Sequence, residues 1–173
     1  MKKQSNSKKN MQKLIIIAAS ALALLVVAFS IKVPPTTGEV SIKKDDLRAE
    51  KVVDGDIVIP ISDITETARF YQANTNGVEL ETLAVKAQDG SIRTAFNTCQ
   101  VCYSSGRGYY VQEGDVLVCQ NCGNRFSMDE VEITKGGCNP VPITEEYKTV
   151  NEDSITISKD FLAEATAIFK NWK

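Results

Sequence analysis

Two pairs of cysteines constrain this chain more than any other feature of its sequence. Cys99 and Cys102 form one C-x-x-C motif and Cys119 and Cys122 form a second, with sixteen residues between the pairs. A C-x-x-C motif in a tight turn can direct both sulfurs to one centre, so two motifs can supply four soft ligands in a tetrahedron. This donor set suits zinc, or iron in a mononuclear or sulfide-bridged site. The spacing therefore predicts a cysteine-ligated metal centre.

Two other interpretations of the paired cysteines stay open from the sequence. An oxidising compartment would favour structural disulfides. A thiol–disulfide exchange centre would need a C-x-x-C motif at the start of a helix, and neither pair precedes a convincing helical pattern. Gly123, directly after the second pair, favours the metal centre, because a residue free to adopt positive φ lets backbone N–H groups turn toward thiolate sulfur.

Cys138 is the fifth cysteine and lies alone in the segment 136–140, GGCNP. It is either an additional or exchangeable ligand, a thiol that receives metal or electrons, or a small buried apolar residue in a turn. Tyr109 and Tyr110 could shield a nearby centre from water, although packing within a strand explains them too. The candidate metal ligands are Cys99, Cys102, Cys119, Cys122 and Cys138.

The chain contains no histidine. This absence excludes Ser-His-Asp and Cys-His catalysis, His-ligated zinc, Rieske clusters and His-ligated haem. Carboxylate pairs such as Glu145 and Glu146 show no spacing that singles them out for acid–base chemistry. We therefore predict no catalytic residue, and expect a metal-binding or electron-transfer component rather than an enzyme.

An apolar run near the N-terminus predicts a membrane anchor. Residues 14–31 are uncharged and follow a basic segment over residues 1–13. Eighteen residues of helix at 1.5 Å each span about 27 Å, close to the ~30 Å hydrocarbon core of a bilayer. The lysines before the run place the N-terminus in the cytoplasm and the rest of the chain outside. We expect a single-pass signal anchor over residues 14–33; a cleaved signal peptide is the alternative.

The remaining chain is acidic and divides into a linker and one domain. From Val33 onward it has fourteen basic and twenty-two acidic residues, a net charge of −8. Nucleic acid is therefore excluded as a partner, because phosphate binding depends on Lys and Arg. Residues 34–53 begin with two prolines and are expected to form a linker away from the cell membrane. Residues 54–173 are expected to form an extracytoplasmic, cysteine-rich domain.

The apolar pattern of this domain predicts an α+β, β-rich fold. Asn76-Gly77, Asp89-Gly90 and Glu113-Gly114 separate β-rich runs and favour hairpin turns. We expect an antiparallel β-meander that delivers the first C-x-x-C, and a hairpin that brings the second back to it, as zinc-ribbon-like double knuckles. The expected strands cover residues 56–61, 68–74, 78–88, 91–98, 108–112, 115–119 and 154–157.

A C-terminal amphipathic helix is expected to cover one face of this sheet. Ser158 is suited to cap a helix from Lys159 to about Trp172. Apolar residues recur along it at the spacing of one helical face. These residues are Phe161, Leu162, Ala165, Ile168, Phe169 and Trp172.

Three segments together resemble a known family: AFNTCQVCY, GRGYYVQEGDVLVCQNCGNRF and GGCNPVPI. They are similar to the FtrD-like membrane iron–sulfur proteins, and the likeness extends loosely from about Asp54 to the terminal helix. The resemblance implies an iron or iron–sulfur protein of membrane iron transport that accepts or passes electrons, with the five cysteines as its ligand candidates. Larger members of the family carry several membrane spans, so a membrane permease or redox protein would be a separate partner here.

The route by which the chain is exported limits which cofactor its site can hold. No twin-arginine signal is present, and a chain exported unfolded does not carry a preassembled cluster. The site therefore holds either a cluster built outside the cell or a single zinc or iron ion acquired there. We expect a metal or redox partner of an iron-transport system; the alternatives are a structural zinc-ribbon-like interaction module and a thiol–disulfide exchange protein.

Overall fold

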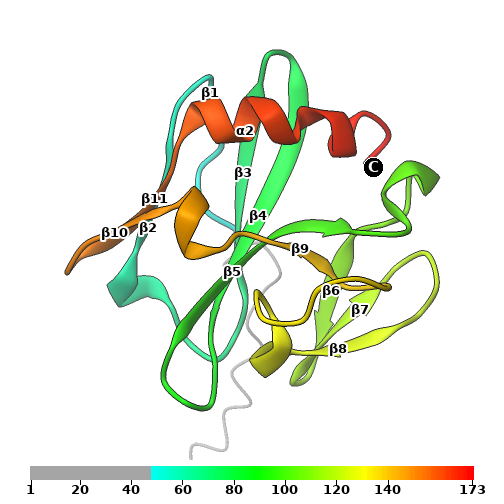
Figure 1. The fold of residues 1–173 in the computed structure, drawn as a ribbon, viewed down its shortest axis with the longest axis horizontal. Coiled ribbons are helices and arrows are strands. Elements are labelled where there is room, and N and C mark those ends of the chain that lie inside the picture. The colour runs from blue at the N-terminus through cyan, green and yellow to red at the C-terminus, as the bar shows by residue number, and fades with distance from the viewer. Residues whose placement is uncertain (1–47) are drawn as a thin grey trace, which may run out of the picture. The chain divides into compact units, whose positions relative to one another are not determined.

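A computed structural model describes residues 48–173, which form three small β-sheets and one short α-helix (Figure 1). The predicted anchor over residues 14–33 and most of the linker lie outside the described residues. Within residues 48–173, no helix combines the length and the apolar character needed to cross a membrane.

The centre of the largest sheet is the predicted antiparallel meander. Its strands are β3 (Arg69–Thr75), β4 (Val78–Lys86) and β5 (Ile92–Cys99). Gly77 and Gly90 adopt φ of 77° and 84° in the connecting turns, in the region that glycine enters without strain. The prediction of two hairpins from the Asn-Gly and Asp-Gly turns is confirmed.

Two short strands complete this sheet, and the sequence pattern did not predict them. β1 (Val52–Val53) runs parallel to β3 along one edge. β9 (Pro140–Pro142) runs antiparallel to β5 along the other edge. Proline donates no backbone hydrogen bond, so a strand flanked by prolines is suited to an edge. The register between β5 and β9 shifts between Phe96 and Cys99, directly before the first C-x-x-C motif.

A second sheet joins distant parts of the chain in the order β10 (Thr149–Val150), β11 (Ser154–Ile157) and β2 (Ile57–Pro60). Pro60 ends the edge strand β2, as its sequence predicted. Ile57 and Ile59 are buried, but Ile61 does not continue that face. It begins a 3-10 helix because the strand stops at Pro60, and it is half-buried.

The third sheet contains the second cysteine pair's hairpin. β6 (Tyr110–Glu113) and β7 (Val116–Cys119) pair across Gly114 and Asp115, one residue later than the predicted Glu113-Gly114 turn, and Gly114 has a φ of 63°. A third strand, β8 (Arg125–Ser127), follows the second knuckle and pairs with β7. Figure 1 shows this small sheet below the end of β5. The hairpin is confirmed, but it forms a sheet of its own.

The C-terminal helix is shorter than its sequence predicted. α2 covers Lys159–Ala165, and the Ser158 side chain accepts the Phe161 N–H as expected of a cap. The chain then tightens into a 3-10 helix, since the Thr166 N–H and its hydroxyl both donate to the Ala163 carbonyl. The prediction of one continuous helix to Trp172 is therefore wrong. The 3-10 helices are Ile61–Asp63, Tyr103–Ser105, Met128–Glu130, Glu145–Tyr147 and Thr166–Phe169.

Two apolar clusters share the structure. The larger one packs α2 and the 3-10 turn after it against the sheets, with Phe96 in ring contact with Phe161 and Phe169. The smaller one includes residues of β3, β4 and β5 and the β6–β7 hairpin, and it contains Cys99 and Cys119. The cysteines therefore belong to a packed core.

Candidate metal centre

The first knuckle begins where β5 ends. Cys99 is its last residue, and the Cys102 N–H donates to the Cys99 sulfur at 3.3 Å. The Cys99 N–H donates to the Gly108 carbonyl at 2.6 Å, which closes the loop between the two residues. Backbone N–H groups that point at sulfur stabilise a thiolate, so this turn is built to hold a deprotonated cysteine.

The second knuckle repeats this design at the end of β7. The Cys119 N–H donates to the Asn124 carbonyl at 2.9 Å, and the Gly123 N–H donates back to the Cys119 carbonyl at 2.8 Å. The nearby backbone N–H groups of Asn121 and Cys122 act to lower the pKa of Cys119, although burial outweighs them. Gly123 has a φ of 73°, as predicted from its place after the motif. The glycine makes the tight turn without strain.

Cys138 reaches the centre on a third segment, and its carbonyl is fixed from two sides. The Tyr110 hydroxyl donates to the Cys138 carbonyl at 2.8 Å, and the Asn124 side chain donates to it at 2.9 Å. Tyr110 itself is buried. The sequence placed Cys138 alone in a turn, and the structure brings it to both knuckles.

A buried ion pair holds the loop that leads to Cys138. The Glu132 carboxylate accepts the Thr94 N–H at 2.8 Å and the Lys148 ammonium at 2.7 Å. Lys148 and Glu132 side chains are only 4% and 11% exposed. Glu132 has a φ of 70°, which is strained for a residue with a side chain. These two contacts hold the strained conformation, and the bond from Thr94 anchors the loop to β5.

The five sulfurs come together as one cluster. The Sγ atoms of Cys99, Cys102, Cys119 and Cys138 all lie within 4.8 Å of one another. Cys138 Sγ lies 3.2 Å from Cys99 Sγ and 3.7 Å from Cys102 Sγ. Bonds of ~2.3 Å from one tetrahedral ion to thiolates set neighbouring sulfurs about 3.8 Å apart. These four soft donors therefore fit a single Cys-ligated metal ion.

Cys122 lies on the outside of this group. Its Sγ is 2.7 Å from Cys138 Sγ, well short of the ~3.8 Å expected between two ligands of one tetrahedral ion. Cys122 is also outside the group of four sulfurs that lie within 4.8 Å of one another. Cys99 and Cys119 are buried, Cys102 and Cys138 are half-buried and Cys122 is exposed. The centre has a closed inner side and an open outer side.

The thiols differ in acidity. Burial acts to raise the pKa of Cys99, but the hydrogen bond from the Cys102 N–H and the nearby Tyr110 side chain outweigh it, and this pKa is lowered. The contact with the Cys138 thiol lowers the pKa of Cys122 to about 7, and the Asn124 N–H contributes to the same shift. Burial raises the pKa of Cys119 to about 11, and burial raises that of Cys138 as well. All five cysteines are free thiols.

In the metal-free protein, Cys122 is expected to be alkylated before the other cysteines. The thiolate is the reactive form, so its rate with iodoacetamide should rise with pH through about 7, whereas an ordinary thiol gains reactivity near 9. Mass spectrometry of peptides after short labelling at several pH values measures this order. Faster labelling of buried Cys119 than of Cys122 would contradict the arrangement of the site.

Two contributors to the site were not predicted from the sequence, and a third was named without its specific role. Asn124 and Glu132 have no local pattern that marks them, because their partners lie far along the chain. Tyr110 was named as a possible shield, and the GYY segment before the second knuckle was the one signal available. The structure gives its hydroxyl a specific contact with the Cys138 carbonyl.

The fold and the site define a β-rich protein whose clustered cysteine thiols can hold a metal ion. The family described as "Membrane iron-sulfur containing protein FtrD-like" matches residues 63–169. The chain belongs to this family of membrane iron–sulfur proteins, as its cysteine segments predicted.

The other comparisons add little. No curated protein matches the chain. The crystal structure of the quaternary ammonium Rieske monooxygenase CntA in complex with an inhibitor is similar over 62% of this chain at 15% identity, with a TM-score of 0.40. The chain spans 32% of the length of that protein.

Proposed function

We propose that this protein presents one cysteine-ligated iron ion on the outer side of the cell membrane, as a redox or metal partner of a membrane iron-transport system. The observation that carries the proposal is the group of four free thiols whose sulfurs lie within 4.8 Å of one another. Membership of a membrane iron–sulfur family supports iron over zinc. Iron held by thiolates supplies one-electron chemistry.

A single ion suits this group of sulfurs better than a sulfide-bridged cluster. Irons linked by sulfide hold their thiolates on separate metal atoms, which requires a wider cage of sulfurs than one ion does. The separations of 3.2 and 3.7 Å from Cys138 Sγ to Cys99 Sγ and Cys102 Sγ are those of a narrow cage. The same geometry agrees with a site that is filled after export.

The membrane position is supported by the apolar run over residues 14–31 and by the family. An anchor there would hold the acidic domain near the membrane surface, where a permease could receive metal or electrons. The exposed outer side of the centre, at Cys122, gives such a partner access to the ion.

The test is elemental analysis and a visible spectrum of the full chain, purified in detergent under anaerobic conditions. Ferric iron bound to thiolates absorbs visible light, so about one iron per chain with a colour that appears on oxidation supports the proposal. A colourless protein with one zinc would favour the structural interaction module. A metal-free protein with a reducible disulfide would favour thiol–disulfide exchange.

We expect Cys122 and Cys138 to substitute for each other as the fourth ligand. Cys122→Ser should leave metal affinity nearly unchanged, and Cys138→Ser should reduce it by about tenfold, because the neighbouring thiol can take the vacant corner. In the double variant, metal affinity should fall by a factor far larger than the product of the two single-variant factors. Competition with a chelator measures all three affinities, and additive losses would show that the two sulfurs do not exchange.

A further inference from the structure

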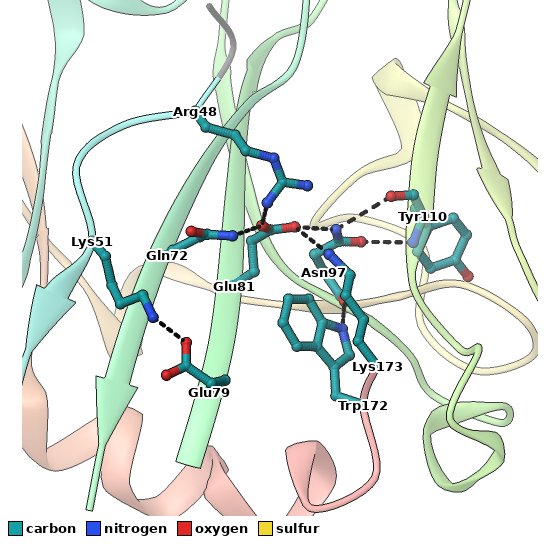
Figure 2. Close-up of polar contacts among 9 residues, drawn as sticks. All are labelled: Arg48, Lys51, Gln72, Glu79, Glu81, Asn97, Tyr110, Trp172 and Lys173. Atoms are coloured by element: carbon teal, nitrogen blue, oxygen red, sulfur yellow. Dashed lines mark hydrogen bonds and ion pairs between the residues drawn. The ribbon is translucent and has the colours of Figure 1, made fainter. Parts of the chain in front are cut away.

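A carboxylate is fully buried in the middle of β4, close to the metal centre but outside it. The Glu81 side chain accepts the Asn97 amide N–H at 2.7 Å, the Gln72 amide N–H at 3.1 Å and the Lys173 ammonium at 3.4 Å. It also pairs with the Arg48 guanidinium. Figure 2 shows these donors converging on Glu81. A buried charge is tolerated only when it is paired and hydrogen-bonded, and here both conditions are met.

Glu81 decides which way the Asn97 side chain faces. A carboxylate is only an acceptor, so the amide nitrogen of Asn97 must point at it and the amide oxygen must point away. That oxygen accepts the Tyr110 N–H at 2.7 Å, and the nitrogen also donates to the Tyr110 carbonyl at 3.2 Å. The Asn97 amide thus makes with Tyr110 the pair of bonds that a neighbouring strand would make.

This contact joins the two halves of the metal centre. Asn97 lies two residues before Cys99 in β5, and Tyr110 is the register partner of Cys119 in the β6–β7 hairpin. The Tyr110 hydroxyl contacts the Cys138 carbonyl. Tyr110 therefore touches all three segments that bring cysteines to the site, and Asn97 fixes its backbone.

We propose that Glu81 and Asn97 are positioning residues for the metal centre: the buried carboxylate sets the direction of the Asn97 amide, and that amide holds Tyr110 so that the three cysteine-bearing segments meet. The inference rests on the proposed function, since it concerns the same centre. Trp172 supports the arrangement from the other side, because its indole N–H donates to the Asn97 carbonyl at 2.7 Å (Figure 2).

The experiment exchanges the hydrogen-bond donor and the hydrogen-bond acceptor between positions 81 and 97. In Glu81→Gln, Asn97 faces an amide that can offer either its oxygen or its nitrogen. In Asn97→Asp, two carboxylates face each other and neither can donate a hydrogen bond. In the double variant Glu81→Gln/Asn97→Asp, the new amide can again donate to the new carboxylate, which still accepts the Tyr110 N–H, although the bond to the Tyr110 carbonyl is not restored. The net charge of the pair is also restored. A positioning role therefore predicts that the second substitution rescues the first.

Cobalt(II) is the probe, because its absorption reports how many thiolates bind it. The full chain in detergent is loaded with cobalt, and release to a chelator is timed. Each single variant should release cobalt about tenfold faster than the wild type, the effect of leaving buried hydrogen-bonding groups unsatisfied. The double variant should release cobalt more slowly than either single variant without reaching the wild-type rate, because the Tyr110 carbonyl still lacks its amide donor.

A stability control separates positioning from general weakening. Ile157→Ala opens a cavity in the other apolar cluster, away from the cysteines, and should not change cobalt release. The inference is overturned if this variant accelerates release as much as Asn97→Asp does, if the single variants behave as wild type, or if the double variant is no better than the worse single one. If the wild type binds no cobalt at all, the proposed function itself fails.

Discussion

Replacement of Cys119 by serine is expected to weaken metal binding about 100-fold, far more than replacement of the exposed Cys122. Cys119 is buried at the end of β7, and no spare thiol lies on the inner side of the centre to replace it. A serine hydroxyl stays protonated and is a poor ligand for a soft site. Structural zinc sites with four ligands bind the ion with a free energy of ~10–16 kcal/mol. One ligand therefore accounts for about 3 kcal/mol, or ~100-fold in affinity.

Metal content per chain and a competition titration measure this loss. Cys122→Ser is the matched control, because it makes the same chemical change at an exposed sulfur and should retain metal. If the Cys119 and Cys122 variants lose metal equally, the distinction between a closed inner side and an open outer side is wrong.

Gly108→Ala is expected to disrupt the first knuckle although it removes no ligand. An added Cβ would collide with the Cys102 carbonyl group and lie 2.9 Å from the Tyr103 nitrogen. These are backbone atoms that cannot rotate away, so the turn carrying Cys102 must shift. Overpacking of this kind destabilises proteins by about 1–3 kcal/mol. The free energy of unfolding from urea titration should fall by that amount, and metal occupancy should fall with it.

Gly114→Ala provides the control for the glycine substitution. Gly114 lies in the β6–β7 turn with a φ of 63°, and an added Cβ meets no atom within 4 Å. Backbone strain should lower the free energy of unfolding by about 1–2 kcal/mol, while metal occupancy stays at the wild-type value. Equal metal loss in both variants would mean that the centre tolerates no destabilisation, and that the collision at Gly108 has no specific role.

The hairpins could be predicted from the sequence because each depends on local chemistry. Asn76-Gly77 and Glu113-Gly114 fix their turns within a few residues, and β3–β4 and β6–β7 pair across them as expected. The separation into three sheets could not be predicted in this way. The pairing of β2 with β11 joins residues almost a hundred positions apart. No local pattern specifies such a contact.

The burial of polar residues also could not be predicted from the sequence. Glu79 and Glu81 alternate with apolar residues, which is the pattern of a solvated strand face. Glu79 is exposed, but Glu81 is fully buried because Asn97, Arg48 and Lys173 gather around it. Cys138 likewise is held by partners elsewhere in the chain, since its carbonyl accepts the Tyr110 hydroxyl and the Asn124 amide.

The two hydrogen bonds to the Cys138 carbonyl have a kinetic consequence. A carbonyl oxygen has two lone pairs, and here the Tyr110 hydroxyl and the Asn124 amide use both, so this peptide group cannot reorient without breaking both hydrogen bonds. Any exchange of the ion between Cys122 and Cys138 must then proceed by rotation about a side-chain bond. Such rotations take picoseconds to nanoseconds, whereas loop rearrangements take nanoseconds to microseconds. The backbone would stay still while the ion changed its fourth partner.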